Sequence, residues 1–248
     1  MAGSGVSTRR NLVVGWMLAL LAIALFVVLG FWQLDRGHKK QAVLTQVQAV
    51  LAERRAQPLV AASDMARARA YDWAAGSGVF IDAPAVLLDN QQREGRPGVR
   101  VYRVFAPTQG ATLLVELGWL PLPGARRMPD VPRPQGSMRI EGLLAPRPSH
   151  GIATAVAVPL ANGALLTIGL EAANLNLALR QPRLAPRVLK LDPVLPLGYA
   201  RDLDVLPNTL PPQRHLGYAV QWFALALAVL VTTLVLSLRK PRRKRAAP

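Results

Sequence analysis

The chain contains no cysteine, and its only histidines are His38, His150 and His215. The absence of cysteine excludes disulfides, thiolate metal sites, iron–sulfur ligation and cysteine nucleophiles. Three imidazoles could form a zinc site only if all of them converged. Composition therefore argues against a metal centre built from protein ligands alone.

Acidic residues are missing from both ends of the chain. Residues 1–11 and 239–248 carry eight positive charges, while the remaining 22 Lys and Arg face all 14 Asp and Glu, a net of +8 for the middle. Half of the total excess of +16 is thus concentrated in the two tails. This distribution has a membrane explanation, and it argues against a nucleic-acid partner.

Charge is also absent from two long apolar runs, Asn11–Leu34 and Leu216–Leu238. Each run exceeds about 20 residues, which is enough for a helix to cross the hydrocarbon core of a bilayer. The first run is longer than the apolar region of a signal peptide and lacks a small-residue cleavage site, so we expect an uncleaved anchor. The sequence predicts two transmembrane helices.

The orientation follows from the basic cluster Arg239–Arg245, which comes directly after the second run. The positive-inside rule places this cluster, and therefore both tails, in the cytoplasm. We expect a multi-pass protein of the bacterial inner membrane, with the mitochondrial inner membrane as the alternative. The predicted organisation is a cytoplasmic tail, a first transmembrane helix, a periplasmic or intermembrane-space domain, a second transmembrane helix and a basic cytoplasmic tail, over residues 1–11, 12–34, 35–215, 216–238 and 239–248.

The segment between the runs has a mostly β pattern. A helix is expected to continue over His38–Arg55, and a short one fits Glu171–Arg180. Five or six short strands separated by turn residues suggest a mostly antiparallel sheet, barrel-like or curled, in a membrane α+β protein. The candidate strands are Val86–Leu88, Val99–Phe105, Thr112–Trp119, Met138–Leu144, Ala164–Ile168 and Val188–Leu191.

No set of residues in this domain has the pattern of a catalytic site. Ser149 and His150 lie in a proline-flanked turn, and Asp202 and Asp204 lie two apart in an extended segment. Gly76-Ser77-Gly78 lacks the lysine of a phosphate loop. We therefore expect no enzymatic activity, with a periplasmic hydrolase using Asp202, Asp204 or His150 as the least favoured alternative.

Three motifs together carry a resemblance to a known family. They are Phe31-Trp32-Gln33-Leu34-Asp35-Arg36, Leu114-Val115-Glu116-Leu117-Gly118-Trp119-Leu120-Pro121, and His215-Leu216-Gly217-Tyr218-Ala219-Val220-Gln221-Trp222-Phe223. In this order, within a two-span hairpin, they resemble the surfeit locus protein 1 family over nearly the whole chain. One departure stands out, because Glu116 and Leu117 occupy the places where the family usually has Asn and Arg.

The resemblance implies a chaperone-like factor in respiratory-chain biogenesis, which takes part in assembling haem–copper cytochrome c oxidase. It implies binding or delivery of haem a, with the catalytic oxidase subunit, the haem a synthesis machinery and membrane lipid as partners. The alternative is a cofactor-free scaffold that docks oxidase subunits or another envelope complex.

The residues at the two membrane boundaries suit such a role. On a helix, Tyr218 and Trp222 follow His215 by three and seven positions, so all three share one face. An imidazole beside aromatic rings suits a haem, whose iron His215 would ligate. Trp32 and Arg36 present a ring and a cation on the other helix, where the cation could pair with a propionate or with lipid phosphate. Aromatic, His and Arg residues also occur in ordinary interfacial belts, which is the competing interpretation.

Overall fold

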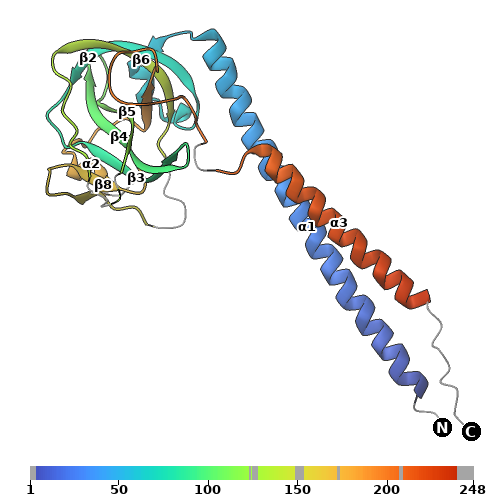
Figure 1. Ribbon diagram of the computed structural model, residues 1–248. Coiled ribbons are helices and arrows are strands. Elements are labelled where there is room, and N and C mark those ends of the chain that lie inside the picture. The colour runs from blue at the N-terminus through green and yellow to red at the C-terminus, as the bar shows by residue number, and fades with distance from the viewer. Residues whose placement is uncertain are drawn as a thin grey trace, which may run out of the picture. The chain divides into compact units, whose positions relative to one another are not determined.

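The computed structural model describes residues 4–122, 124, 128–148, 154–171, 174–206 and 209–238 (Figure 1). The chain divides into a helical unit, residues 1–43 and 210–248, and a β-rich unit, residues 44–209. Helix α1 (Ser4–Glu53) begins in the first unit and ends in the second, and α3 (Pro212–Leu238) belongs to the first.

In the helical unit, α1 and α3 run antiparallel. Near one end, Trp16 donates its indole N–H to Ser237 Oγ at 2.9 Å, and near the other Lys40 Nζ donates to the carbonyl oxygen of Leu210 at 2.7 Å. Small residues allow the close approach, because Ala219 is fully buried and a Cβ on Gly30 would lie 2.6 Å from the Phe223 ring. Both helices are long and apolar enough to cross a membrane.

Among the described residues of the β-rich unit, nine strands form one mixed sheet. Their order is β1-β2-β6-β9-β5-β4-β3-β8-β7, with antiparallel pairings in the majority and parallel pairings for β1–β2, β3–β8 and β5–β9. The strands are β1 (Gln57–Pro58), β2 (Asp72–Phe80), β3 (Val86–Arg93), β4 (Arg96–Pro107), β5 (Leu113–Pro121), β6 (Ser137–Pro146), β7 (Val158–Pro159), β8 (Leu165–Thr167) and β9 (Arg187–Leu191).

The pairing of β2 with β4 joins two strands that are separated in this order. As a result β2, β6, β9, β5 and β4 pair in a closed cycle. Side chains on alternate positions of these strands enter two core clusters. Leu113, Val115 and Leu117 of β5 belong to the larger cluster, whereas Leu114 belongs to the other. Glu116 lies two residues from Leu114 and therefore on the same side of the strand as Leu114.

Short non-strand elements complete the unit. Two 3₁₀ helices, η1 (Leu59–Ser63) and η2 (Met65–Arg67), follow β1. Helix α2 covers only Leu175–Ala178, which is shorter than the predicted Glu171–Arg180. The last turns of α1 pack in this unit, where Val47 contacts a cluster with Trp73 and Leu143. Arg54 follows the helix with a φ of 42° and places its guanidinium 4.8 Å from the centroid of the Trp73 ring.

The six predicted strands correspond to β3, β4, β5, β6, β8 and β9. The two-residue strands β1 and β7 were not predicted, and neither was the longer strand β2. Its sequence is rich in alanine and glycine, which have low strand propensity. The structure explains this composition by close packing. A Cβ on Gly78 would lie 2.2 Å from the carbonyl oxygen of Ala106, and one on Gly76 would lie 2.9 Å from Leu59. Glycine is needed at Gly78 for β2 to pair with β4.

Candidate functional site

The imidazole of His215 lies between the two apolar helices. His215 is buried in the first turn of α3, and its Nδ1 lies 2.8 Å from Oε1 of Gln33 on α1. A Cβ on Gly37 would lie 3.3 Å from Cβ of His215, so a small residue lets this turn approach α1. Because an amide oxygen can only accept, the contact requires Nδ1 to carry the proton. Nε2 then holds the lone pair in the neutral ring.

Nε2 of His215 is buried and has no hydrogen-bond partner among the residues that the structure describes. A buried polar atom without a partner is unusual in a folded protein. A histidine with Nδ1 held by a second group and Nε2 free is the arrangement typical of metal-ligating histidines. His215 therefore has this bonding pattern, and its role as a ligand to haem iron stays a prediction.

The other boundary residues do not converge on His215. Trp222 is half-buried and stacks on Phe26 at 5.6 Å, whereas Tyr218 is 37% exposed. On α1, Trp32 is 53% exposed and Arg36 is also exposed. His215 and Trp222 thus turn toward α1, and the remaining aromatic and cationic side chains cover the outer surface of the helices. Their role in binding a cofactor stays a prediction.

The other histidines lie elsewhere. His38 is exposed and lines a small cavity of about 180 Å³ with Leu34, Gly37, Gln41 and the first turn of α3. His150 lies outside the described residues, as does the basic cluster 239–245. No group of three or more His, Asp and Glu that could hold a metal ion occurs in the described part of the chain.

A second polar site lies in the β-rich unit, on three neighbouring strands. Tyr102 of β4 is directly opposite Glu116 of β5, and Glu116 is directly opposite Lys190 of β9. The Tyr102 hydroxyl donates to Glu116 Oε2 at 2.9 Å, and Lys190 Nζ lies 3.1 and 3.3 Å from the two carboxylate oxygens. Arg100, two residues before Tyr102, donates to Glu116 Oε1. We call Arg100, Tyr102, Glu116 and Lys190 the Glu116 cluster.

A bulge in β5 brings these residues together. The register between β4 and β5 shifts after Val101, which pairs with Gly118 while Tyr102 pairs with Glu116. Leu117 is the extra residue and enters the core, and Gly118 has a φ of +126° that disfavours other residues. Leu117 therefore packs as an ordinary core side chain, whereas Glu116 is the polar centre of the strand.

The charges around Glu116 determine its protonation. Burial alone would raise the pKa of the Glu116 carboxyl, but the positive charges of Lys190 and Arg100 outweigh burial and hold it below its ordinary value. Burial, together with the nearby Glu116 charge, raises the pKa of Tyr102 well above its ordinary value. At neutral pH the cluster therefore contains a carboxylate, two cations and a neutral phenol.

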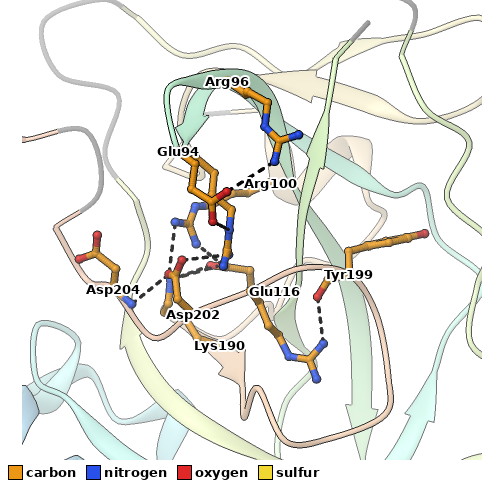
Figure 2. A network of polar contacts seen from close by, with 10 residues as sticks. Glu94, Arg96, Arg100, Glu116, Lys190, Tyr199, Asp202 and Asp204 are labelled. Carbon is orange, nitrogen blue, oxygen red and sulfur yellow. Dashed lines mark hydrogen bonds and ion pairs between the residues drawn. The ribbon is translucent and has the colours of Figure 1, made fainter.

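Asp202 extends the cluster toward solvent (Figure 2). It accepts from Arg93 at 3.0 Å and lies 3.7 Å from Nη2 of Arg100, while its Oδ1 also accepts from the backbone N–H of Asp204. Asp204 is exposed and accepts from the backbone N–H of Leu206. These two aspartates thus form ion-pair and turn contacts, and no nucleophile–base arrangement joins them in the described residues.

A separate buried ion pair lies at the start of β2 and β9. Arg187 is completely buried, and its Nη2 lies 2.7 Å from Asp72 Oδ2 and 3.0 Å from the Ala70 carbonyl oxygen. Arg67 donates to both oxygens of Asp72, from Nε to Oδ2 and from Nη2 to Oδ1. Burial would raise the pKa of Asp72, but the hydrogen bonds from Arg67 and Arg187 lower it below its ordinary value. This pair ties two strands and η2 together.

Sequence reasoning did not find these buried charges. Strand register decides which residues face one another, and register depends on tertiary contacts. One feature of the sequence does indicate a buried charge. Glu116 is the single acidic residue inside the apolar run Leu113–Leu120. A charge in such a run requires a partner when the strand is buried on both faces.

The chain is thus a mixed, sheet-rich domain between two apolar helices, an arrangement compatible with a membrane-anchored protein. The model of the SURF1 family matches residues 20–227, and the chain belongs to this family. It is also 25% identical to a SURF1-like protein of Rickettsia felis over 231 residues, which cover 90% of this chain and 94% of the relative. The resemblance expected from the three motifs is confirmed.

Proposed function

We propose that this protein is a non-enzymatic assembly factor for haem–copper cytochrome c oxidase, which binds haem a and delivers it to the catalytic subunit. Membership of the SURF1 family supports the assembly role. The observation that carries the haem part is His215, whose Nε2 is buried without a partner in the described residues while Nδ1 contacts Gln33.

In this proposal, His215 supplies an iron ligand and Gln33 holds the imidazole in the tautomer that leaves Nε2 free. Trp222 and Tyr218 offer aromatic surface on the same helix, and Trp32 and Arg36 offer a ring and a cation for a propionate on α1. Bound haem a would supply the redox-active iron that the oxidase needs. The contribution of the protein is binding, orientation and release.

The proposed location is the bacterial inner membrane, with both tails in the cytoplasm and the β-rich unit in the periplasm. Arg239–Arg245 supports this orientation by the positive-inside rule. We further infer that the closed cycle of β2, β6, β9, β5 and β4 curls into a barrel-like sheet. The oxidase catalytic subunit and the haem a synthesis machinery are the proposed partners.

A cofactor-free scaffold is the second candidate. The observation that favours it is the exposure of Trp32, Tyr218 and Phe31 on the helices, because exposed aromatic side chains suit contact with another membrane subunit. In this version His215 and Gln33 hold α1 and α3 together, and the oxidase subunit binds the outer surface.

The variant His215→Ala separates the two candidates, with His38→Ala as the matched control because His38 is exposed at the same end of the helices. Haem retained by the purified protein is measured from its Soret absorbance, and oxidase assembly from the haem a band in reduced-minus-oxidised membrane spectra. We expect His215→Ala to lose both and His38→Ala to keep both. Retention of haem and normal assembly by His215→Ala would refute the ligand role. Absence of haem from the wild-type protein, with oxidase subunits co-purifying, would favour the scaffold.

A further inference from the structure

The first turn of α3 is packed so that the imidazole of His215 is covered. His215 is 6% exposed, and its Nε2 is buried without a partner among the described residues. A bond between a metal ion and a histidine nitrogen is about 2 Å long, so a haem cannot reach a nitrogen that the protein itself covers. The turn must therefore move before Nε2 can act as the ligand that the proposed function assigns to it.

Three residues on one face of α1 hold this turn. Gln33, Gly37 and Lys40 follow one another at intervals of four and three residues, which places them in a row along the helix. At one end of the row, Oε1 of Gln33 lies 2.8 Å from Nδ1 of His215. At the other end, Nζ of Lys40 donates to the carbonyl oxygen of Leu210 at 2.7 Å. The turn is thus attached to α1 on both sides of Gly37.

The contact of Lys40 fixes the chain where it enters α3. Leu210 lies two residues before the helix begins at Pro212. The neighbouring Lys39 pairs with Asp35, whereas Lys40 forms no ion pair in the described part of the chain. The hydrogen bond from Lys40 to Leu210 is exposed. Water can replace either partner of such a bond, so it can break and form again readily.

Gly37 makes the close approach of the turn possible. A Cβ at Gly37 would lie 3.3 Å from Cβ of His215 and 3.5 Å from the carbonyl oxygen of Pro212. A longer side chain at this position would therefore hold the turn away from α1. The same change at Gly15 is harmless, because a Cβ there would meet nothing within 4 Å.

The packed position of the turn carries a cost. A buried nitrogen without a hydrogen bond is unfavourable, and movement of the turn would let Nε2 of His215 meet water or a ligand. The contacts of Gln33 and Lys40 favour the packed position instead. Opposing contributions of this kind allow a small change at one contact to shift the population of the two positions.

We propose that the first turn of α3 is a gate for the His215 site, which Lys40 holds closed. When the gate is open, the turn has moved away from Gly37 and Nε2 is accessible. The use of the gate rests on the proposed ligand role of His215, because the apparent affinity for a ligand falls with the fraction of molecules that are open. The gate itself is a property of the chain without haem, so it can be measured separately.

The first test contains no haem. The full chain in lipid nanodiscs is treated with diethyl pyrocarbonate, which acylates accessible neutral imidazoles, and modification of His215 and His38 is followed by mass spectrometry of peptides. His38 is exposed and serves as the internal reference. We expect His215 to react much more slowly than His38 in the wild-type protein. Equal rates would overturn the gate, because Nε2 would then not be covered.

Two variants should open the gate, and two matched variants should not. A typical hydrogen bond is worth about fivefold in an equilibrium constant, so Lys40→Met should speed modification of His215 about fivefold. Gly37→Leu should speed it at least as much. Lys39→Met and Gly15→Leu should leave the rate unchanged. The proposal fails if neither Lys40→Met nor Gly37→Leu alters the rate at His215.

The second test closes the gate reversibly and measures binding of ferric haem b by Soret absorbance. Because the chain has no cysteine, Lys40→Cys and Leu210→Cys can be joined by a bifunctional methanethiosulfonate linker that dithiothreitol removes. We expect haem binding to be about tenfold weaker or more with the linker than after its removal. The same linker between Trp16→Cys and Ser237→Cys, at the other end of the helices, should make no difference.

The two tests separate the gate from the proposed function. If wild-type protein binds haem through His215 and the linker at Lys40→Cys and Leu210→Cys has no effect, the gate is refuted and the ligand role stands. If the wild-type protein binds no haem, the ligand role fails, and the modification rates at His215 alone decide whether the gate exists.

Discussion

The two units of this protein differ in the polar groups that they bury. In the described part of the helical unit, the contacts that join α1 to α3 are neutral or involve a single charge, such as His215 with Gln33 and Trp16 with Ser237. The β-rich unit buries complete ion pairs, with Arg187 at 0% and Glu116 at 2% exposure.

The difference follows from backbone geometry. A helix satisfies its backbone internally, so two apolar helices need only small residues and a few hydrogen bonds to pair. A sheet places side chains of neighbouring strands in rows. Tyr102, Glu116 and Lys190 form such a row, so each charge finds its partner on the next strand. In the Glu116 cluster, buried charge is therefore compensated by side chains that strand register places opposite one another. Asp72 and Arg187 instead meet across the intervening strand β6.

Two aspartate pairs allow this comparison to be tested at equal distance. Asp72 lies 2.7 Å from Arg187, and Asp35 lies 2.7 Å from Lys39, but the first pair is buried and the second is exposed. The variant Asp72→Ala leaves the buried Arg187 guanidinium without its carboxylate. We expect a loss of about 3–5 kcal/mol in the free energy of unfolding, measured by urea titration in detergent with tryptophan fluorescence. A loss below about 1 kcal/mol is typical of exposed ion pairs. It would contradict the expected effect of burial on the Asp72–Arg187 pair.

The Glu116 cluster should show strong coupling between its members. Glu116→Leu leaves two buried cations together, whereas Glu116→Leu combined with Lys190→Met removes one charge of each sign. We expect a coupling energy of about 2–3 kcal/mol from the double-mutant cycle, read from the same urea titrations. Additive effects of the two substitutions would contradict the cluster.

The pH dependence of the free energy of unfolding tests the same interactions of Glu116 independently. The pKa of Glu116 is lower in the folded chain than in the unfolded chain, so the carboxylate stabilises the fold above the unfolded pKa. This contribution is lost as the pH falls through the lower, folded pKa. Between pH 6 and pH 3 the wild-type protein should therefore lose more stability than the double variant, which has no carboxyl at this position.

Much of the architecture could be predicted because it depends on local sequence. The charge-free runs and the apolar segments are properties of consecutive residues, and they correspond to α1, α3 and six strands. Strand β2 could not be predicted, because its glycines Gly76 and Gly78 are required by close contacts with Leu59 and Ala106. These two residues are distant from the glycines in sequence. Strand propensity depends on residue type alone and therefore carries no information about such a contact.

The candidate sites also differ in how far they could be predicted from local sequence. The His215 motif could be singled out because helical spacing is fixed, but its contact with Gln33 depends on how the two helices pair. The Glu116 cluster could not be predicted, because a bulge at Leu117 sets the register that places Tyr102 opposite Glu116. One residue of slip would move Glu116 to the other face of β5.

Small residues, rather than charges, should control pairing in the helical unit. A Cβ on Gly30 would meet the Phe223 ring at 2.6 Å, whereas one on Gly15 would meet nothing within 4 Å. We expect Gly30→Leu to weaken pairing of α1 with α3 by about 1–2 kcal/mol through overpacking, and Gly15→Leu to have no effect. Because the chain has no cysteine, Trp16→Cys and Ser237→Cys can be added to both variants and the yield of a thiol crosslink compared. Equal yields would show that Gly30 is not a packing contact.

The smallest effect is expected at the exposed pair of the helical unit. Asp35 and Lys39 are 55% and 71% exposed and lie one helical turn apart. Water already solvates both charges, so Asp35→Asn should cost only about 0.3–0.5 kcal/mol, against several for Asp72→Ala at the same distance. Thermal loss of the helical circular dichroism signal in detergent measures this, with Lys39→Gln as the reciprocal variant. A large loss in Asp35→Asn that Lys39→Gln does not share would mean that Asp35 has a second partner, and burial would then no longer explain the difference between the two pairs.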